Sequence, residues 1–171
     1  MSERYRLTAK QKEEVAQNLI DILDSNSEIT ALTRDFVYTW VRRPDGQGKE
    51  KAFSDVWDIV LKKYMPGTRP VLFRSCNRRS GNGKIESFTS SFDCAKRISE
   101  GKGALIICDT KDSLRVDELR ESGEEYKSTF YPLVDVLKKM KGSGRWIDEM
   151  LGEEEYIMRV DVENMHFFRW K

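Results

Sequence analysis

The hydrophobic pattern of this sequence changes its period near Pro70, and this change limits the folds that the chain can adopt. Before Pro70, apolar residues recur every three to four positions, which is the spacing of amphipathic helices. After Pro70, apolar residues gather in short runs that are typical of β-strands. A helical part followed by a strand-rich part predicts an α+β fold.

The part before Pro70 is expected to form a layer of three helices over residues 1–68. Thr8 and Gln11 form a capping-box pair at the start of the first helix. Trp40 and Trp57 recur at helical spacing, so we expect them in the core rather than in a binding site. The predicted helices are Thr8–Asp24, a helix from Ser27 that stops before the Arg43-Pro44-Asp45-Gly46 turn, and Phe53–Tyr64.

The part after Pro70 is expected to be rich in β-strands. The predicted strands are Val71–Cys76, Ile85–Thr89, Ala104–Cys108, Tyr156–Val160 and Met165–Trp170. We expect the last two to form a closing hairpin around Glu163-Asn164. Helices are predicted near 92–100 and 132–141, and the charged segment 110–128 gives no clear pattern. Because a chain of 171 residues has the size of one domain, we expect the helical layer and the strands to form a single domain.

Composition excludes several classes of protein. The chain has 30 basic and 29 acidic residues, so it lacks the charge excess of a general nucleic-acid or membrane-surface binder. His166 is the one histidine, which argues against histidine triads and multi-histidine metal sites, and we expect no metal. Three widely spaced cysteines, no signal peptide and no apolar span predict a cytoplasmic protein, in a bacterium or an infected host cell.

A basic segment surrounds Arg74. Arg74 interrupts the apolar run Val-Leu-Phe-Arg-Ser-Cys, and a buried arginine needs an anionic partner. Between Arg69 and Ile85 there are five basic residues and no acidic one, a pattern that suits a bound phosphate or diphosphate. A structural arginine beside a solvated loop explains the segment equally well.

A hydroxyl-rich strand and an acidic cluster follow. In Glu86-Ser87-Phe88-Thr89, strand alternation places Ser87 and Thr89 on one face and Phe88 on the other. Such hydroxyls can orient a carboxylate on a neighbouring strand, although a helix cap is the common use of this composition. Glu153, Glu154 and Glu155 open the strand Tyr156–Val160, with Glu153 and Glu155 expected on one side and Glu154 on the other. Such a run is usually a solvated face, but here it leads into an apolar strand.

These three segments, taken in order, resemble the Arg-Ser-Glu class of ADP-ribosyltransferases. The class includes bacterial toxins and the enzymes that T-even-type bacteriophages use on their hosts, and the phage enzymes are the most similar. The matching pieces are Leu-Phe-Arg-Ser (72–75), Ser-Phe-Thr-Ser-Ser-Phe-Asp-Cys-Ala (87–95) and Glu-Glu-Glu-Tyr-Ile-Met (153–158). Two departures are Ser75, where many relatives have glycine, and a chain that ends soon after the glutamate strand. The resemblance implies a split β-sandwich over residues 69–171, with the helical part in front of it.

The resemblance also implies roles for individual residues. NAD⁺ is the substrate, and Glu155 stabilises the charge that develops on its ribose. Ser87 orients Glu155, and Glu153 acts on the acceptor. The residues expected to bind NAD⁺ are Arg74, Ser75, Ser87, Thr89 and Phe92. The loop Gly142–Gly152 corresponds to the substrate-recognition turn of the family, where Trp146 either contacts the acceptor or packs internally.

The acceptor stays open between two kinds of macromolecule. A protein arginine is expected first, and a DNA or RNA base is the alternative, with Arg78 and Arg79 available to either NAD⁺ or a nucleic acid. A protein of a different class, a binding module with this fold and no activity, is the third interpretation. A toxin of this family is expected to have an inhibitory antitoxin as its partner.

Overall fold

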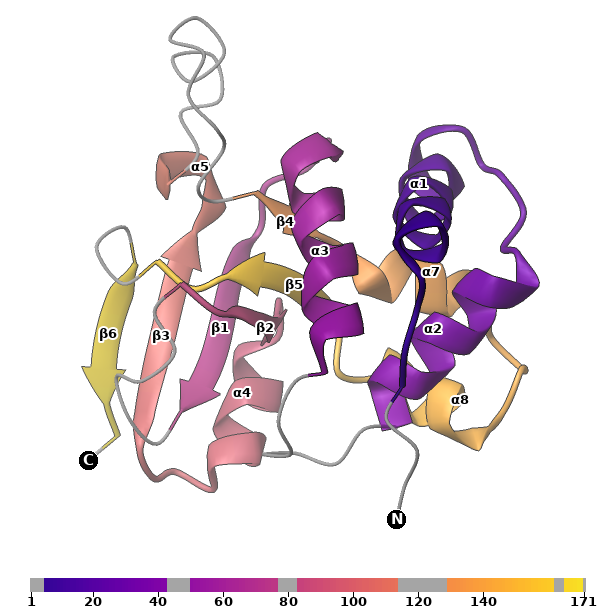
Figure 1. Ribbon diagram of the computed structural model, residues 1–171. Helices are drawn as coiled ribbons and strands as arrows, with labels where there is room; N and C mark the ends of the chain where they lie inside the picture. Colours follow the sequence, from indigo (N-terminus) through magenta and orange to yellow (C-terminus); the bar gives the residue numbers. More distant parts are fainter. Residues whose placement is uncertain (1–4, 43–49, 77–82, 114–128, 162–164, 171) are drawn as a thin grey trace, which may run out of the picture. The chain divides into compact units, whose positions relative to one another are not determined.

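The computed structural model describes residues 5–42, 50–76, 83–113, 129–161 and 165–170. It combines helices with an antiparallel sheet, so the predicted α+β class is confirmed. Figure 1 labels the elements along the chain. The helices are α1 (Ala9–Asp24), α2 (Ala31–Arg42), α3 (Lys51–Lys63), α4 (Phe92–Ser99), α5 (Thr110–Ser113), α7 (Leu133–Lys139) and α8 (Arg145–Leu151). The strands are β1 (Val71–Cys76), β2 (Ile85–Thr89), β3 (Ala104–Asp109), β4 (Phe130–Tyr131), β5 (Glu155–Arg159) and β6 (His166–Arg169).

The chain divides into two compact units. The first contains Met1–Lys63 and Asp135–Gly152 and is helical, whereas the second contains Tyr64–Val134 and Glu153–Lys171 and holds the sheet. The sequence pattern placed all residues after 68 in the β-rich part. In the structure, Asp135–Gly152 belongs to the helical unit instead.

The helical unit begins as the sequence predicted. Thr8 caps α1, and its hydroxyl and the Gln11 side chain form the reciprocal pair of a capping box. The second helix starts at Ala31, later than the expected Ser27. The Asn18 side chain binds the Thr30 backbone N–H at 3.1 Å, and the Thr30 hydroxyl accepts from the Thr33 N–H at 3.2 Å. Thr30 therefore acts as the N-cap of α2, and the helix begins at the next residue.

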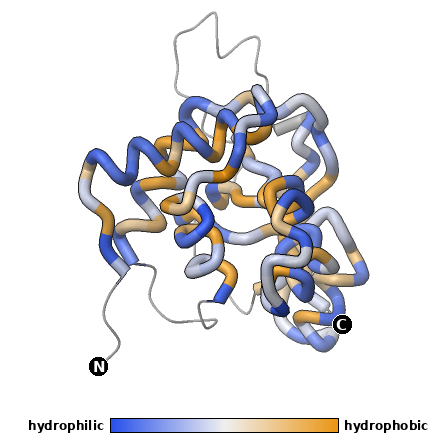
Figure 2. Tube along the Cα trace, turned by 90° about the vertical axis from the view of Figure 1, so that its right-hand side faces the viewer, coloured by the Kyte–Doolittle hydropathy of each residue, from blue (hydrophilic) through white to orange (hydrophobic). Residues whose placement is uncertain are grey.

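An aromatic cluster fills the core of the helical unit. Trp40 and Trp57 are 3% and 0% exposed, which confirms the prediction that they are core residues. Their rings meet edge to face at 5.5 Å, and Phe36 and Phe53 pack against them at 5.3 and 5.4 Å. Figure 2 shows hydrophilic and hydrophobic residues interleaved along the helical turns, as expected for amphipathic helices.

The segment Gly142–Gly152 is largely helical, and the expectation of a loop there was wrong. Helix α8 occupies Arg145–Leu151, with Ile147 fully buried. The Asp148 carboxylate accepts from the Gly142 backbone N–H at 2.8 Å, which closes the turn that leads into this helix. Trp146 lies on α8 in the helical unit and is 48% exposed.

The second unit is built on a six-stranded antiparallel sheet in the order β4-β5-β2-β1-β3-β6. In Figure 1, β1, β3 and β6 run side by side. Strand β1 pairs with β3 along all six of its residues, and β2 pairs with β5 along all five of its own. Within the described residues, β1 and β2 meet at the single pair Phe73–Thr89. The sheet therefore consists of two three-stranded halves joined at one narrow seam.

The last two strands do not form a hairpin, so that prediction was wrong. Strand β5 pairs with β2 and β4, whereas β6 pairs with β3 at the opposite edge of the sheet. The expected turn Glu163-Asn164 lies outside the described residues. The two strands therefore belong to different half-sheets, which local turn signals cannot reveal.

The two half-sheets share one hydrophobic cluster. Its buried members come from both sides of the seam and are Leu72, Phe88, Ile106, Cys108, Phe130, Met158, Val160 and Met165. The cluster explains why these strands are apolar on one face. No helix in the described part of the chain has the length and apolarity to cross a bilayer.

Candidate active site

Ser87 and Glu155 form the centre of the candidate site. On neighbouring strands, Ser87 faces Ile157 and Thr89 faces Glu155, so Ser87 and Glu155 are diagonal neighbours on one face of the sheet. The Ser87 hydroxyl donates to Glu155 Oε1 at 2.5 Å, which is a short hydrogen bond. Glu155 is only 5% exposed. Phe88 points into the hydrophobic cluster, in agreement with the predicted alternation.

Arg74 reaches the backbone of Ser87 from the other half-sheet. Its Nη1 donates to the Ser87 backbone carbonyl at 2.8 Å, so the arginine crosses the seam between β1 and β2. Its Nη2 lies 3.0 Å from Glu86 Oε2. The anionic partner that a half-buried arginine needs is therefore a neighbour of Ser87 on β2. Glu86 was not predicted as this partner, although it directly precedes Ser87 and ends the stretch without acidic residues.

The three consecutive glutamates are held by three hydroxyl groups. Thr89 Oγ1 donates to the Glu153 carbonyl at 2.7 Å, and Ser90 Oγ donates to Glu154 Oε2 at 3.0 Å. Glu154 has a φ of 47°, in the left-handed region, and β5 begins only at Glu155. Regular strand alternation therefore does not extend back to Glu153, which corrects the expected placement of the three side chains.

Glu153 lies close enough to Cys94 for its charge to affect the pKa of the thiol. Burial raises the pKa of the Cys94 thiol, and the negative charge of Glu153 adds to this effect. Cys94 is on α4, the helix capped by Ser91, whose hydroxyl accepts from the Cys94 N–H at 3.1 Å. The start of α4 and the acidic turn are thus neighbours.

Two of the residues expected to contact NAD⁺ are engaged with the protein itself. The Ser75 hydroxyl donates to the Ala95 carbonyl, which ties β1 to α4. Thr89 is 6% exposed, and its hydroxyl also accepts from the Ser91 N–H at 3.0 Å. Both residues support the walls of the site through these bonds, so any contact with a ligand would be additional.

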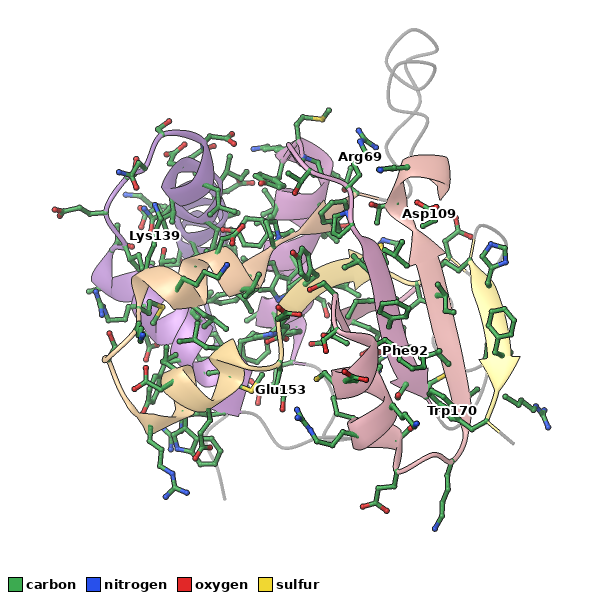
Figure 3. All side chains as sticks on the ribbon, turned by 180° about the vertical axis from the view of Figure 1, so that it is seen from behind. Arg69, Phe92, Asp109, Lys139, Glu153 and Trp170 are labelled. Carbon is green, nitrogen blue, oxygen red and sulfur yellow. The ribbon has the colours of Figure 1, made fainter. Side chains whose placement is uncertain are left out.

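Phe92 lies at the first turn of α4 and is 43% exposed. Its ring meets Phe73 edge to face at 5.7 Å and lies 5.8 Å from the ring of Trp170. Figure 3 labels Phe92 and Trp170, which lie close together. Phe73 is the residue that pairs with Thr89 at the seam. Trp170 was not predicted at this site, because no local signal in the sequence links residue 170 to α4.

The remaining expected site residues are Trp146, Arg78 and Arg79. Trp146 belongs to the helical unit, and its role stays a prediction. Arg78 and Arg79 lie outside the described residues. Within the described ranges, no group of three or more His, Cys, Asp or Glu side chains is placed to hold a metal ion.

Comparison of the chain with protein-family models, with curated proteins and with solved structures finds no match.

Proposed function

We propose that this protein is a mono-ADP-ribosyltransferase, which cleaves NAD⁺ at the nicotinamide–ribose bond and transfers ADP-ribose to a macromolecule. The observation that carries the proposal is the contact between the Ser87 hydroxyl and the buried Glu155 carboxylate, with Arg74 bound to the backbone carbonyl at position 87. Burial of a carboxylate that is 5% exposed costs free energy of desolvation and so destabilises the fold. A catalytic role for Glu155 therefore explains its burial better than a contribution to stability does.

The seam in the sheet also supports this function. A split β-sandwich, as the resemblance implies, needs two half-sheets that diverge from a shared core. Here β1 and β2 are joined at one described residue pair, and residues of both strands meet at that junction. Arg74 from one half and Ser87 from the other belong to two of the three motifs that carry the resemblance.

The chemistry requires stabilisation of a cation. As the glycosidic bond of NAD⁺ breaks, its electron pair moves to the nicotinamide nitrogen, and the ribose becomes an oxocarbenium-like cation. The negative charge of Glu155, oriented by Ser87, stabilises this cation. The Arg74 guanidinium binds the diphosphate. The aromatic ring of Phe92 covers the nicotinamide.

The acceptor attacks the ribose carbon from which nicotinamide departs. An arginine acceptor is protonated in water and must lose a proton as the new C–N bond forms. Glu153 accepts this proton, which makes a protein arginine the proposed acceptor. A nucleic-acid base would attack the same ribose carbon, and it is the second outcome that the acceptor experiment can return.

Release of nicotinamide from NAD⁺ tests the proposal. Glu155→Gln removes the charge and keeps the shape, so we expect nicotinamide release to fall at least 100-fold, the order typical of a lost transition-state charge interaction. Glu154→Gln is the matched control, since it makes the same change at the exposed neighbour, and it should retain activity within about threefold. Equal release by wild type and Glu155→Gln would leave a binding module without catalysis.

The acceptor is identified by incubating the protein with labelled NAD⁺ and cell lysate. Separate portions are then treated with nuclease and with protease. Label that survives nuclease and is lost with protease supports a protein acceptor. Label that is lost with nuclease contradicts the arginine proposal and assigns the same chemistry to a nucleic acid.

A further inference from the structure

Glu86 forms an ion pair with Arg74. Arg74 Nη2 and Glu86 Oε2 are 3.0 Å apart, and the two side chains are 27% and 15% exposed. Strand alternation places Glu86 on the same face of β2 as Phe88, opposite to the face that carries Ser87. Glu86 therefore approaches Arg74 from the opposite side of β2 to the Ser87–Glu155 pair.

Two adjacent residues of β2 fix the guanidinium at two points. Nη1 donates to the carbonyl of Ser87 at 2.8 Å, and Nη2 pairs with the carboxylate of Glu86. A planar guanidinium held at two of its nitrogens has a defined orientation. Of these two contacts, the one to Ser87 is a hydrogen bond and the one to Glu86 is an ion pair.

We propose that Glu86 is a positioning residue, which holds the Arg74 guanidinium in the orientation that receives the diphosphate of NAD⁺. This inference rests on the proposed function. Preorganisation of this kind reduces the entropy that is lost when the ligand binds. Because Glu86 acts through Arg74 on the diphosphate and not on the bond that breaks, its loss should raise the KM for NAD⁺ and leave kcat nearly unchanged.

An opposite effect competes with this role. Glu86 is negative, and its charge weakens the attraction of Arg74 for a diphosphate. If Glu86 were only a competing counter-ion, its removal would lower the KM. The direction of the change in KM therefore separates a positioning residue from a competing charge.

The experiment measures KM and kcat for nicotinamide release in wild type, Glu86→Ala and Glu86→Gln. We expect Glu86→Ala to raise the KM about tenfold, with kcat within about threefold of wild type. Glu86→Gln keeps an oxygen that accepts from Arg74, so its KM should stay within about threefold of wild type. This conservative variant also covers the case in which Glu86→Ala folds poorly.

A double-mutant cycle shows whether the effect passes through Arg74. In an Arg74→Lys background, Glu86→Ala should change the KM by less than about twofold, because the guanidinium that it orients is absent. Glu154→Ala is the control for loss of an exposed carboxylate near the site and should leave the KM unchanged.

The outcomes separate failure of this inference from failure of the proposed function. No nicotinamide release by wild type overturns the proposed function and the inference with it. An active wild type with an unchanged or lowered KM in Glu86→Ala overturns the inference alone. A full additional effect of Glu86→Ala in the Arg74→Lys background overturns it as well.

Discussion

Replacing Ser87 with alanine removes the hydroxyl that donates to Glu155 and changes little else in volume. The bond is 2.5 Å long and its acceptor is a carboxylate that is 5% exposed. A hydrogen bond to a charged group contributes about 1.5–3 kcal/mol. If that contribution is made in the transition state, Ser87→Ala should lower kcat/KM for nicotinamide release by about 10- to 150-fold.

The assay compares Ser87→Ala with Ser90→Ala. Both variants remove a serine hydroxyl that donates to a glutamate, but Ser90 contacts Glu154, which is exposed. Water can replace that contact, so Ser90→Ala should keep kcat/KM within about threefold. Melting curves recorded alongside establish that both variants are folded. A folded Ser87→Ala with kcat/KM within twofold of wild type would refute the argument that this hydroxyl orients the catalytic carboxylate.

Three further predictions concern the acceptor, the helical unit and the sheet. Glu153→Gln should abolish transfer to an arginine acceptor and spare hydrolysis of NAD⁺, as followed by mass spectrometry and nicotinamide release; normal transfer would refute the role of Glu153. Two lysine side chains lower the pKa of Asp55, so its stabilising effect is present above pH 3.8 and is lost as the pH falls below it. Asp55→Asn should therefore cost about 1 kcal/mol at pH 7 and nothing near pH 2 in urea unfolding, whereas an equal cost at both pH values would contradict this. Leu72→Ala should cost about 2–5 kcal/mol and Val71→Ala under about 1, because they are 0% and 40% exposed; similar losses would contradict the placement of the core.

Local sequence signals were sufficient for most elements of the fold. The Thr8 capping box located the start of α1 because a cap depends on residues that are near each other in sequence. The bounds of β1 and β2 were predicted because β1 begins with an apolar run and β2 contains Ile, Phe and Thr, which favour strands. Helix α8 was missed because Gly142, Gly144 and Gly152 surround a short segment and indicate a loop.

Features that depend on strand pairing were not predictable in the same way. The last two strands are neighbours in sequence and were expected to pair, but β6 lies beside β3, which no turn signal specifies. The partner of Arg74 was missed for the same reason, since Glu86 reaches it only because β1 and β2 meet at the seam. The contact between Ser87 and Glu155 was expected because the resemblance supplied the pairing that the sequence pattern alone lacks.

A crystal structure of the protein with a non-hydrolysable NAD⁺ analogue tests the central claim most directly. We expect the ribose that carries nicotinamide to lie within hydrogen-bond distance of Glu155, with the diphosphate on the Arg74 guanidinium. An analogue bound elsewhere, or no binding at millimolar concentration, would contradict it.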